Sequence, residues 1–294
     1  MSVRFGIDDM IQPLRRAAVK RPREAWLGQS EIAARHADLG FSAEPDFERA
    51  VAEHRALVEL LRSCDVEVLA ALEDNRTSLD SIYVHDAAHL SERGAFILAP
   101  TKPSRCQEGL ALRDALRDWE IPVFSELSRG ARAEGGDLVR LDADTLLVGR
   151  SHRTNELGVL RLRQAFEPLG VEVIEVPLPH WQGHRTCLHL QSMLSMIDHD
   201  LALVWKRPCP ITLLELLRER GIGLVAAVES EVPAQAANVL ALSPRRVVAV
   251  AGANRTRDRL ERAGCEVLTF PGTEIALKGG GGPTCLVLPL WRQA

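Results

Sequence analysis

The feature that most constrains the fold of this chain is a pattern that recurs about every 50 residues. Five times, a helix-like stretch leads into a short apolar strand, and the equivalent strand positions are Val68, Val123, Val173, Leu224 and Val267. The intervals between these positions are 55, 50, 51 and 43 residues. A period of this length is typical of repeat architectures, in which each unit buries its apolar face against its neighbours.

Two further strands and one helix complete each unit. In one unit, residues 137–141 and 145–148 are apolar runs joined by the polar turn 142–144, which is typical of a hairpin. Residues 155–166 then carry apolar side chains at helical spacing. The sequence therefore predicts the order β-β-β-α within a unit.

The first unit is expected to be split between the two ends of the chain. Residues 3–6 and 17–19 can supply strands beside residues 285–290, which would close the five units into a ring. No Pro/Gly/Ser-rich linker interrupts the period, so we expect one domain over residues 1–294. In such a ring, residues remote in sequence converge at the centre.

Composition excludes several classes of partner. A hydrophobic fraction of 46% in 294 residues is enough for a large core, and the net charge of -4 with scattered basic residues predicts no nucleic-acid binding. No stretch reaches the roughly 18 apolar residues of a membrane span, and the start lacks the features of a signal peptide. We expect a cytoplasmic protein without membrane contact, whose six widely spaced cysteines are reduced thiols.

Cys285 is the candidate nucleophile. It follows four glycines, residues 279–282, which allow the backbone to approach another group closely or to adopt positive φ. A thiol attacks well only with a lowered pKa or a nearby base, so its partners must come from other units.

Several polar residues in other units are candidates for the partners of Cys285. Asp80 and Asp86 fall on one face if their segment is a strand, and two such acids are costly to bury unless they meet a cation. Glu134 precedes two glycines, which favours a backbone close to a cationic ligand, although a plain turn fits as well. His189 lies between two leucines of a predicted strand, where a hydrogen-bonded core histidine is the ordinary alternative.

Taken together, these motifs resemble the dimethylarginine dimethylaminohydrolase branch of the amidinotransferase, or guanidino-modifying, superfamily. Seven motifs match in order between residues 46 and 291, namely Asp80 to Asp86, Ser104-Arg105, Glu134-Gly135-Gly136-Asp137, Arg153-Thr154-Asn155, Leu188-His189-Leu190, Ala236-Ala237-Asn238, and Gly281-Gly282-Pro283-Thr284 before Cys285. The resemblance implies an α/β fold, the five-bladed α/β propeller or pentein, with pseudosymmetric ββαβ-type repeats around a central active site.

The resemblance also implies roles for individual residues. Cys285 would be the nucleophile, His189 the general acid and base, and Glu134 the acid that orients the histidine or holds the guanidinium. The implied substrate-binding residues are Asp80, His85, Asp86, Arg105, Arg153 and Asn238, with Asp86 on the guanidinium nitrogens and the two arginines on an α-carboxylate.

The implied reaction is hydrolysis of a guanidino compound, most simply Nω-methylated arginine to citrulline and a methylamine, with no metal or organic cofactor. Two departures bear on the substrate. His85 stands where enzymes of this branch generally carry a glutamate, and residues 26–46, which correspond to a substrate-covering flap, align poorly. Arginine deiminase and amidinotransferase chemistry use the same catalytic set and stay open as alternatives. A homodimer is expected from the size of such surfaces.

Other classes of function fit the sequence less well. Four potential zinc ligands lie within ten residues of the sequence, namely His180, His184, Cys187 and His189. A zinc-binding helix is not expected there, because Pro177, Pro179 and Gly183 interrupt any helix. A non-catalytic ring-shaped binding module would not need all three catalytic groups. A phosphate loop is excluded because no Lys-Ser/Thr follows the glycines and a strand, not a helix, is expected next.

Overall fold

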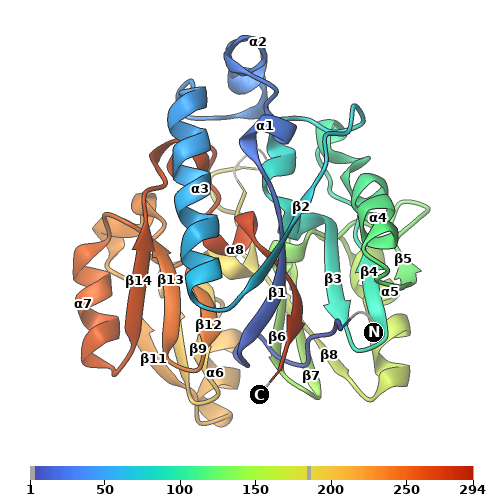
Figure 1. The fold of residues 1–294 in the computed structure, drawn as a ribbon. Helices are drawn as coiled ribbons and strands as arrows, with labels where there is room; N and C mark the ends of the chain where they lie inside the picture. The colour runs from blue at the N-terminus through green and yellow to red at the C-terminus, as the bar shows by residue number, and fades with distance from the viewer. Residues whose placement is uncertain (1–3, 184–186, 294) are drawn as a thin grey trace.

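Five three-stranded sheets form from the residues that the structure describes, 4–183 and 187–293 (Figure 1). In this computed structural model, the middle strand of every sheet runs antiparallel to one neighbour and parallel to the other. The sheets are β15 (Leu288–Arg292), β1 (Leu14–Lys20) and β2 (Glu67–Ala71); β3 (Ala88–Ser91), β4 (Gly94–Ile97) and β5 (Val123–Glu126); β6 (Leu138–Asp142), β7 (Thr145–Arg150) and β8 (Glu172–Pro177); β9 (Leu194–Asp198), β10 (Leu201–Val204) and β11 (Gly223–Ala226); and β12 (Leu240–Ser243), β13 (Arg246–Val250) and β14 (Glu266–Phe270).

One long helix per sheet connects the middle strand to the third strand. These helices are α3 (Phe47–Ser63), α4 (Glu108–Asp118), α5 (Glu156–Phe166), α6 (Ile211–Glu219) and α7 (Asn254–Arg262). Two further helices, α1 (Pro22–Ala25) and α2 (Gln29–Leu39), precede α3, and the short α8 (Pro283–Leu286) lies in the middle of the molecule (Figure 1). Among the described helices, none is long and apolar enough to cross a membrane.

Helix α5 illustrates how the sequence forms these connections. Asn155 accepts a hydrogen bond from the Gly158 N–H at 2.8 Å, which caps the helix at its N-terminus. The spacing of Val159, Leu162 and Phe166 puts all three on one buried face. Helices α3, α4 and α7 likewise contact strands of their own sheets.

The predicted five-fold repeat is confirmed. The five equivalent positions of the sequence pattern all fall in the third strands, β2, β5, β8, β11 and β14. The predicted order β-β-β-α has the right elements, but the repeat unit begins at the wrong strand. The strand after each helix pairs in parallel with the middle strand before that helix, so both belong to the same sheet. A blade is therefore ββαβ, since a parallel strand needs a crossover helix to return to the same sheet.

The ring closes as the sequence predicts. Strand β1 pairs with β15 in antiparallel fashion, with Ala17 opposite Pro289 and Ala18 opposite Leu288. Gly6 adds an isolated bridge to Trp291. Of the predicted strand 3–6, Val3 lies outside the described residues. Whether the single domain expected over 1–294 behaves as one folding unit stays a prediction.

Two predicted strands are wrong. The segment from Asp80 to Asp86 forms two consecutive 3-10 turns, Leu79–Ile82 and Val84–Ala87, and His189 stands before another, Leu190–Ser192. Every residue from 78 to 91 is buried, so alternation of faces does not apply there. The turns are closed by backbone hydrogen bonds, from the Tyr83 N–H to the Asp80 carbonyl at 3.0 Å and from the Asp86 N–H to the Tyr83 carbonyl at 3.3 Å.

Candidate active site

A cavity of ≈ 70 Å³ lies where the loops that enter the five blades meet. The loops before β3, β6, β9, β12 and β15 each contribute to its wall, and so do the loops after β4 and β7. Eight of the residues predicted from the sequence line it, namely Asp80, Asp86, Arg105, Glu134, Arg153, His189, Asn238 and Cys285. Residues spread over 205 positions of the chain thus share one cavity.

Cys285 is presented by the short helix α8. The glycine run permits a close approach: a Cβ at Gly281 would collide with the ring of Tyr83, and Gly280 adopts a φ of +77°. Asn238 Nδ2 donates to Thr284 Oγ1 at 2.7 Å, and the Thr284 N–H donates to Asn238 Oδ1 at 3.1 Å. Asn238 therefore fixes the turn that carries the thiol. The expectation that a strand follows the glycines directly was wrong, because α8 intervenes.

His189 is paired with Glu134. The two side chains are 5% and 1% exposed, and His189 Nε2 lies 2.8 Å from Glu134 Oε2. The other carboxylate oxygen, Oε1, accepts from the Thr101 N–H at 2.9 Å. Both oxygens of the acid are thus engaged, which holds the imidazole in one orientation.

Asp86 is held between a backbone amide and an arginine. Its Oδ1 accepts from Gly136, and its Oδ2 lies 2.8 Å from Arg105 Nη1. Arg105 also contacts both oxygens of Glu108, at 2.8–3.0 Å, and donates to the Tyr83 carbonyl at 3.2 Å. Arg105 was predicted to bind a substrate carboxylate, and the structure instead engages its guanidinium with two buried acids.

The remaining charged residues stand at the mouth of the cavity. Lys102 Nζ lies 3.0 Å from Asp80 Oδ2, and Arg153 Nη1 lies 3.8 Å from Glu134 Oε1. Lys102 and Arg153 also line an adjoining cleft of ≈ 680 Å³, whose other wall is formed by residues 37–40. The predicted flap, residues 26–46, thus reaches the entrance through the end of α2 (Figure 1).

His85 is the predicted site residue that the described cavity wall does not include. Its side chain is buried, with Nε2 3.0 Å from Gln191 Nε2. Burial lowers the pKa of His85 to about 4, so the imidazole is neutral at pH 7. A glutamate at this position would add a charge behind Asp86, whereas His85 adds none.

The pKa values of the catalytic pair diverge. Burial raises the pKa of the Cys285 thiol to about 12, and the neighbouring charge of Asp86 adds to the effect. Burial alone would lower the pKa of His189, but Cys187, Asp86 and Asp137 together hold it well above its usual value. The resting site therefore contains a neutral thiol and an imidazolium.

The two carboxylates of the site are ionised. Burial opposes their charged forms, yet Arg105 and His189 lower the pKa of Asp86 to about 2, and the hydrogen bond from His189 lowers the pKa of Glu134. Two fixed negative charges thus lie beside the thiol. They suit a planar cation whose carbon the sulfur can reach.

Cys187 was missed as a neighbour of the catalytic histidine. Its Sγ lies 3.4 Å from both ring nitrogens of His189, and the Cys-x-His spacing was considered only as part of a zinc motif. Donor atoms of Glu134, Cys187 and His189 lie within 4.8 Å of one another, so these three could hold a metal ion. His180 instead contacts His152 at 2.9 Å, and His184 lies outside the described residues.

Comparison with known proteins gives consistent matches over most of the chain. A family profile described as "N,N dimethylarginine dimethylhydrolase, eukaryotic" matches residues 29–292. An N(G),N(G)-dimethylarginine dimethylaminohydrolase of Pseudomonas aeruginosa is 26% identical over 245 residues, which cover 83% of this chain and 90% of that protein.

Solved structures match the fold. A cysteine-to-serine mutant of the Pseudomonas aeruginosa enzyme, complexed with citrulline, superposes with a TM-score of 0.77 at 23% identity, covering 95% of this chain and all of the other. An amidinotransferase of saxitoxin biosynthesis from Microseira wollei superposes with a TM-score of 0.79 at 15% identity, covering 99% and 98%. These similarities confirm the five-bladed α/β propeller.

Proposed function

This chain belongs to the N,N-dimethylarginine dimethylhydrolase family, and from that membership we propose that it hydrolyses a methylated arginine through a covalent intermediate on Cys285. The observation that carries the proposal is the convergence of a thiol, an imidazolium and two ionised carboxylates on one central cavity. Each of these groups has a task in breaking a guanidinium C–N bond.

Recognition of the guanidinium is assigned to Asp86 and Glu134. Their carboxylates can accept from its N–H groups while the planar carbon faces Cys285. Asp80 would contact the far end of the substrate together with Lys102. We assign carboxylate binding to Arg153, because its side chain lines both the central cavity and the adjoining cleft.

The first half of the reaction forms the covalent adduct. A bound guanidinium brings a positive charge next to Cys285, which lowers the pKa of the thiol, and the proton leaves to solvent. The thiolate attacks the guanidinium carbon and gives a tetrahedral intermediate. His189 then donates its proton to the departing amine, the C–N bond breaks, and a thiouronium remains on the sulfur.

The second half releases the adduct. His189, now neutral, takes a proton from water, and the hydroxide adds to the thiouronium carbon. The C–S bond breaks, the ureido product leaves, and the last proton returns to the sulfur, because the free site favours the thiol. With dimethylarginine the products are citrulline and dimethylamine.

The identity of the leaving amine tests the proposal. The protein is incubated separately with arginine, monomethylarginine, asymmetric dimethylarginine and agmatine, and both products are identified in each case. Dimethylamine with citrulline supports the proposal. Ammonia from arginine would favour a deiminase, amidino transfer to an added amine would favour a transferase, and no turnover of any substrate would favour a non-catalytic binding module.

A further inference from the structure

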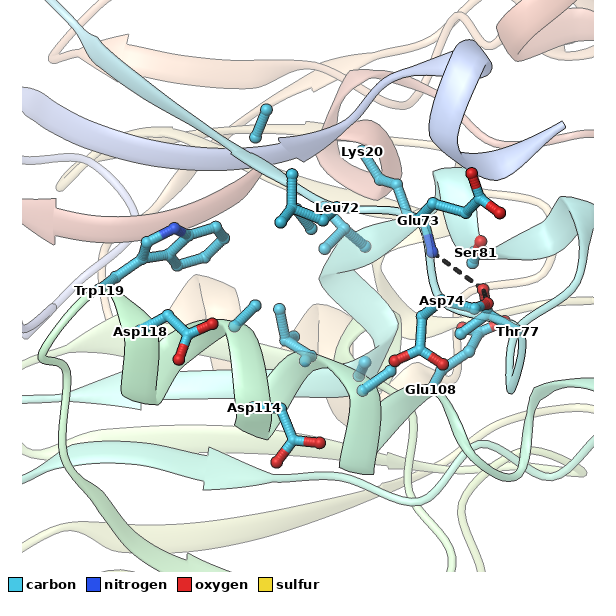
Figure 2. A pocket seen from close by; sticks show the side chains of 17 residues that line it. Lys20, Leu72, Glu73, Asp74, Thr77, Ser81, Glu108, Asp114, Asp118 and Trp119 are labelled. Atoms are coloured by element: carbon cyan, nitrogen blue, oxygen red, sulfur yellow. Dashed lines mark hydrogen bonds between the residues drawn. The ribbon is translucent and has the colours of Figure 1, made fainter. Parts of the chain in front are cut away.

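A second cavity lies outside the active site, between the end of β2 and helix α4 (Figure 2). Its volume is ≈ 250 Å³, compared with ≈ 70 Å³ for the central cavity. That volume suits a metabolite of a few heavy atoms better than a drug-sized ligand. The proposed reaction makes no use of it.

The wall contributed by α4 is a single helix face. Ala111, Leu112 and Ala115 line it at i, i+1 and i+4 positions, and Trp119 closes one end just beyond the helix. Ala70 and Ala71 of β2 line the opposite side. These small apolar side chains leave room for the methylene groups of a ligand, and Trp119 adds further apolar surface.

The polar groups of the cavity are mostly acidic. The lining carboxylates are Glu73, Asp74, Glu108, Asp114 and Asp118, whereas Lys20 is the one cation that lines the described wall. Lys20 is buried and donates to Thr77 Oγ1 at 2.9 Å (Figure 2). The five carboxylates outnumber Lys20 and the two arginines, Arg76 and Arg105, that contact them, so the local charge favours a cation.

Two arginines outside the cavity form ion pairs with three of these carboxylates. Arg76 bridges Asp74 and Asp114, and Arg105 holds Glu108 from the active-site side. Glu73 and Asp118 remain most open to an incoming cation. Asp118 has the exposed Arg117 3.8 Å away, and surface pairs of this kind contribute little energy.

Ser81 supplies an independent sign of a ligand. Its side chain lines the cavity and is 4% exposed, and its hydroxyl has no hydrogen-bond partner among the described residues. Figure 2 shows it near Lys20 and Thr77. Buried hydroxyls are almost always hydrogen-bonded, so an orphan that faces a cavity indicates a missing donor or acceptor.

We propose that this cavity is a second ligand site, which binds a small alkylammonium ion with its charge among the carboxylates and its alkyl chain against α4. The Ser81 hydroxyl accepts one ammonium N–H, and Glu73 neutralises the charge. Glu108 and Arg105 form the partition between this site and the catalytic cavity. A ligand can therefore occupy the second site while the catalytic cavity is empty.

Calorimetric titration with n-butylammonium chloride tests the proposal. We expect saturable binding that weakens by about tenfold or more in Ala115→Leu, which fills the cavity, and by a smaller factor in Ser81→Ala. Binding should be unchanged in Asp258→Asn, a matched acid on the exposed face of α7, and in Glu134→Gln, which would weaken any binding in the catalytic cavity. Sodium butyrate should not bind.

Several results would overturn the proposal. These are the absence of saturable binding, equal affinity in Ala115→Leu, equal binding of butyrate, or loss of binding in Glu134→Gln alone. Near-ultraviolet circular dichroism checks that each variant is folded, and Glu73→Gln replaces Ala115→Leu if the latter is not. None of these results depends on turnover, so failure here is distinguishable from failure of the proposed hydrolase activity.

Discussion

His189 Nε2 lies 2.8 Å from Glu134 Oε2, and this contact orients the imidazole. Replacing Glu134 by glutamine keeps the shape and removes the charge that favours the imidazolium. We expect kcat to fall by about 100-fold or more, in line with the loss of one general acid–base partner. Steady-state kinetics on the variant provide the measurement, and an unchanged kcat would show that the pair is only structural.

The raised pKa of Cys285 predicts a rate that increases with pH. The attacking form is the thiolate, which becomes more populated as pH rises toward about 12, while His189 stays protonated because its pKa is raised. We therefore expect kcat/KM to increase steadily between pH 6 and pH 9, and alkylation of the free enzyme by iodoacetamide to follow the same trend. A rate that decreases above pH 7 would contradict this assignment of protonation states.

The backbone of Gly136 limits the position of His189. A Cβ at this residue would collide with the imidazole, so Gly136→Ala should displace the ring without removing any catalytic group. We expect activity to fall by about 100-fold, since a displacement of about 1 Å is costly in catalysis. Gly223→Ala on β11, where the nearest atom lies at 3.3 Å, is the control and should keep its activity. Equal rates in both variants would contradict the prediction.

Arg105 joins two buried carboxylates, and its loss should affect stability. In Arg105→Met, Glu108 would lose its arginine partner, and Asp86 would keep only His189 as a neighbouring cation. We expect the free energy of unfolding to fall by about 3 kcal/mol or more, as when one partner of a buried ion pair is removed. Urea denaturation monitors the change, and the double variant Arg105→Met/Glu108→Leu should recover part of it. A loss below about 1 kcal/mol would mean that the network contributes little.

The period of the sequence was sufficient to predict the blades, because helix and strand periodicities depend on apolar side chains that every blade must bury. Val68, Val173 and Val267 fall on equivalent strands for that reason. The boundary of the unit could not be read in the same way. Whether the strand after α5 pairs with β7 or with the next hairpin depends on long-range hydrogen bonds, which leave no local pattern.

The site was harder to predict than the fold, and the reason differs from residue to residue. The resemblance supplied Cys285, His189 and Glu134, but the strand expected for residues 80–86 was wrong, because this segment forms 3-10 turns in which every residue is buried. Arg105 was predicted to bind a substrate carboxylate because no motif in the sequence identified Glu108 as its partner. In the structure, Arg105 contacts the Glu108 carboxylate, which lies about one helical turn further along the chain. The spacing between Cys187 and His189 was visible in the sequence, but it was interpreted as part of a zinc motif.

Mass spectrometry of the Cys285 peptide, after the enzyme is quenched during turnover of asymmetric dimethylarginine, tests the central claim most directly. We predict a thiouronium adduct on Cys285 in the native enzyme that is absent from Cys285→Ser, which should remain folded but form no citrulline. Citrulline formation by Cys285→Ser at the native rate, with no adduct on any variant, would contradict covalent catalysis by this residue.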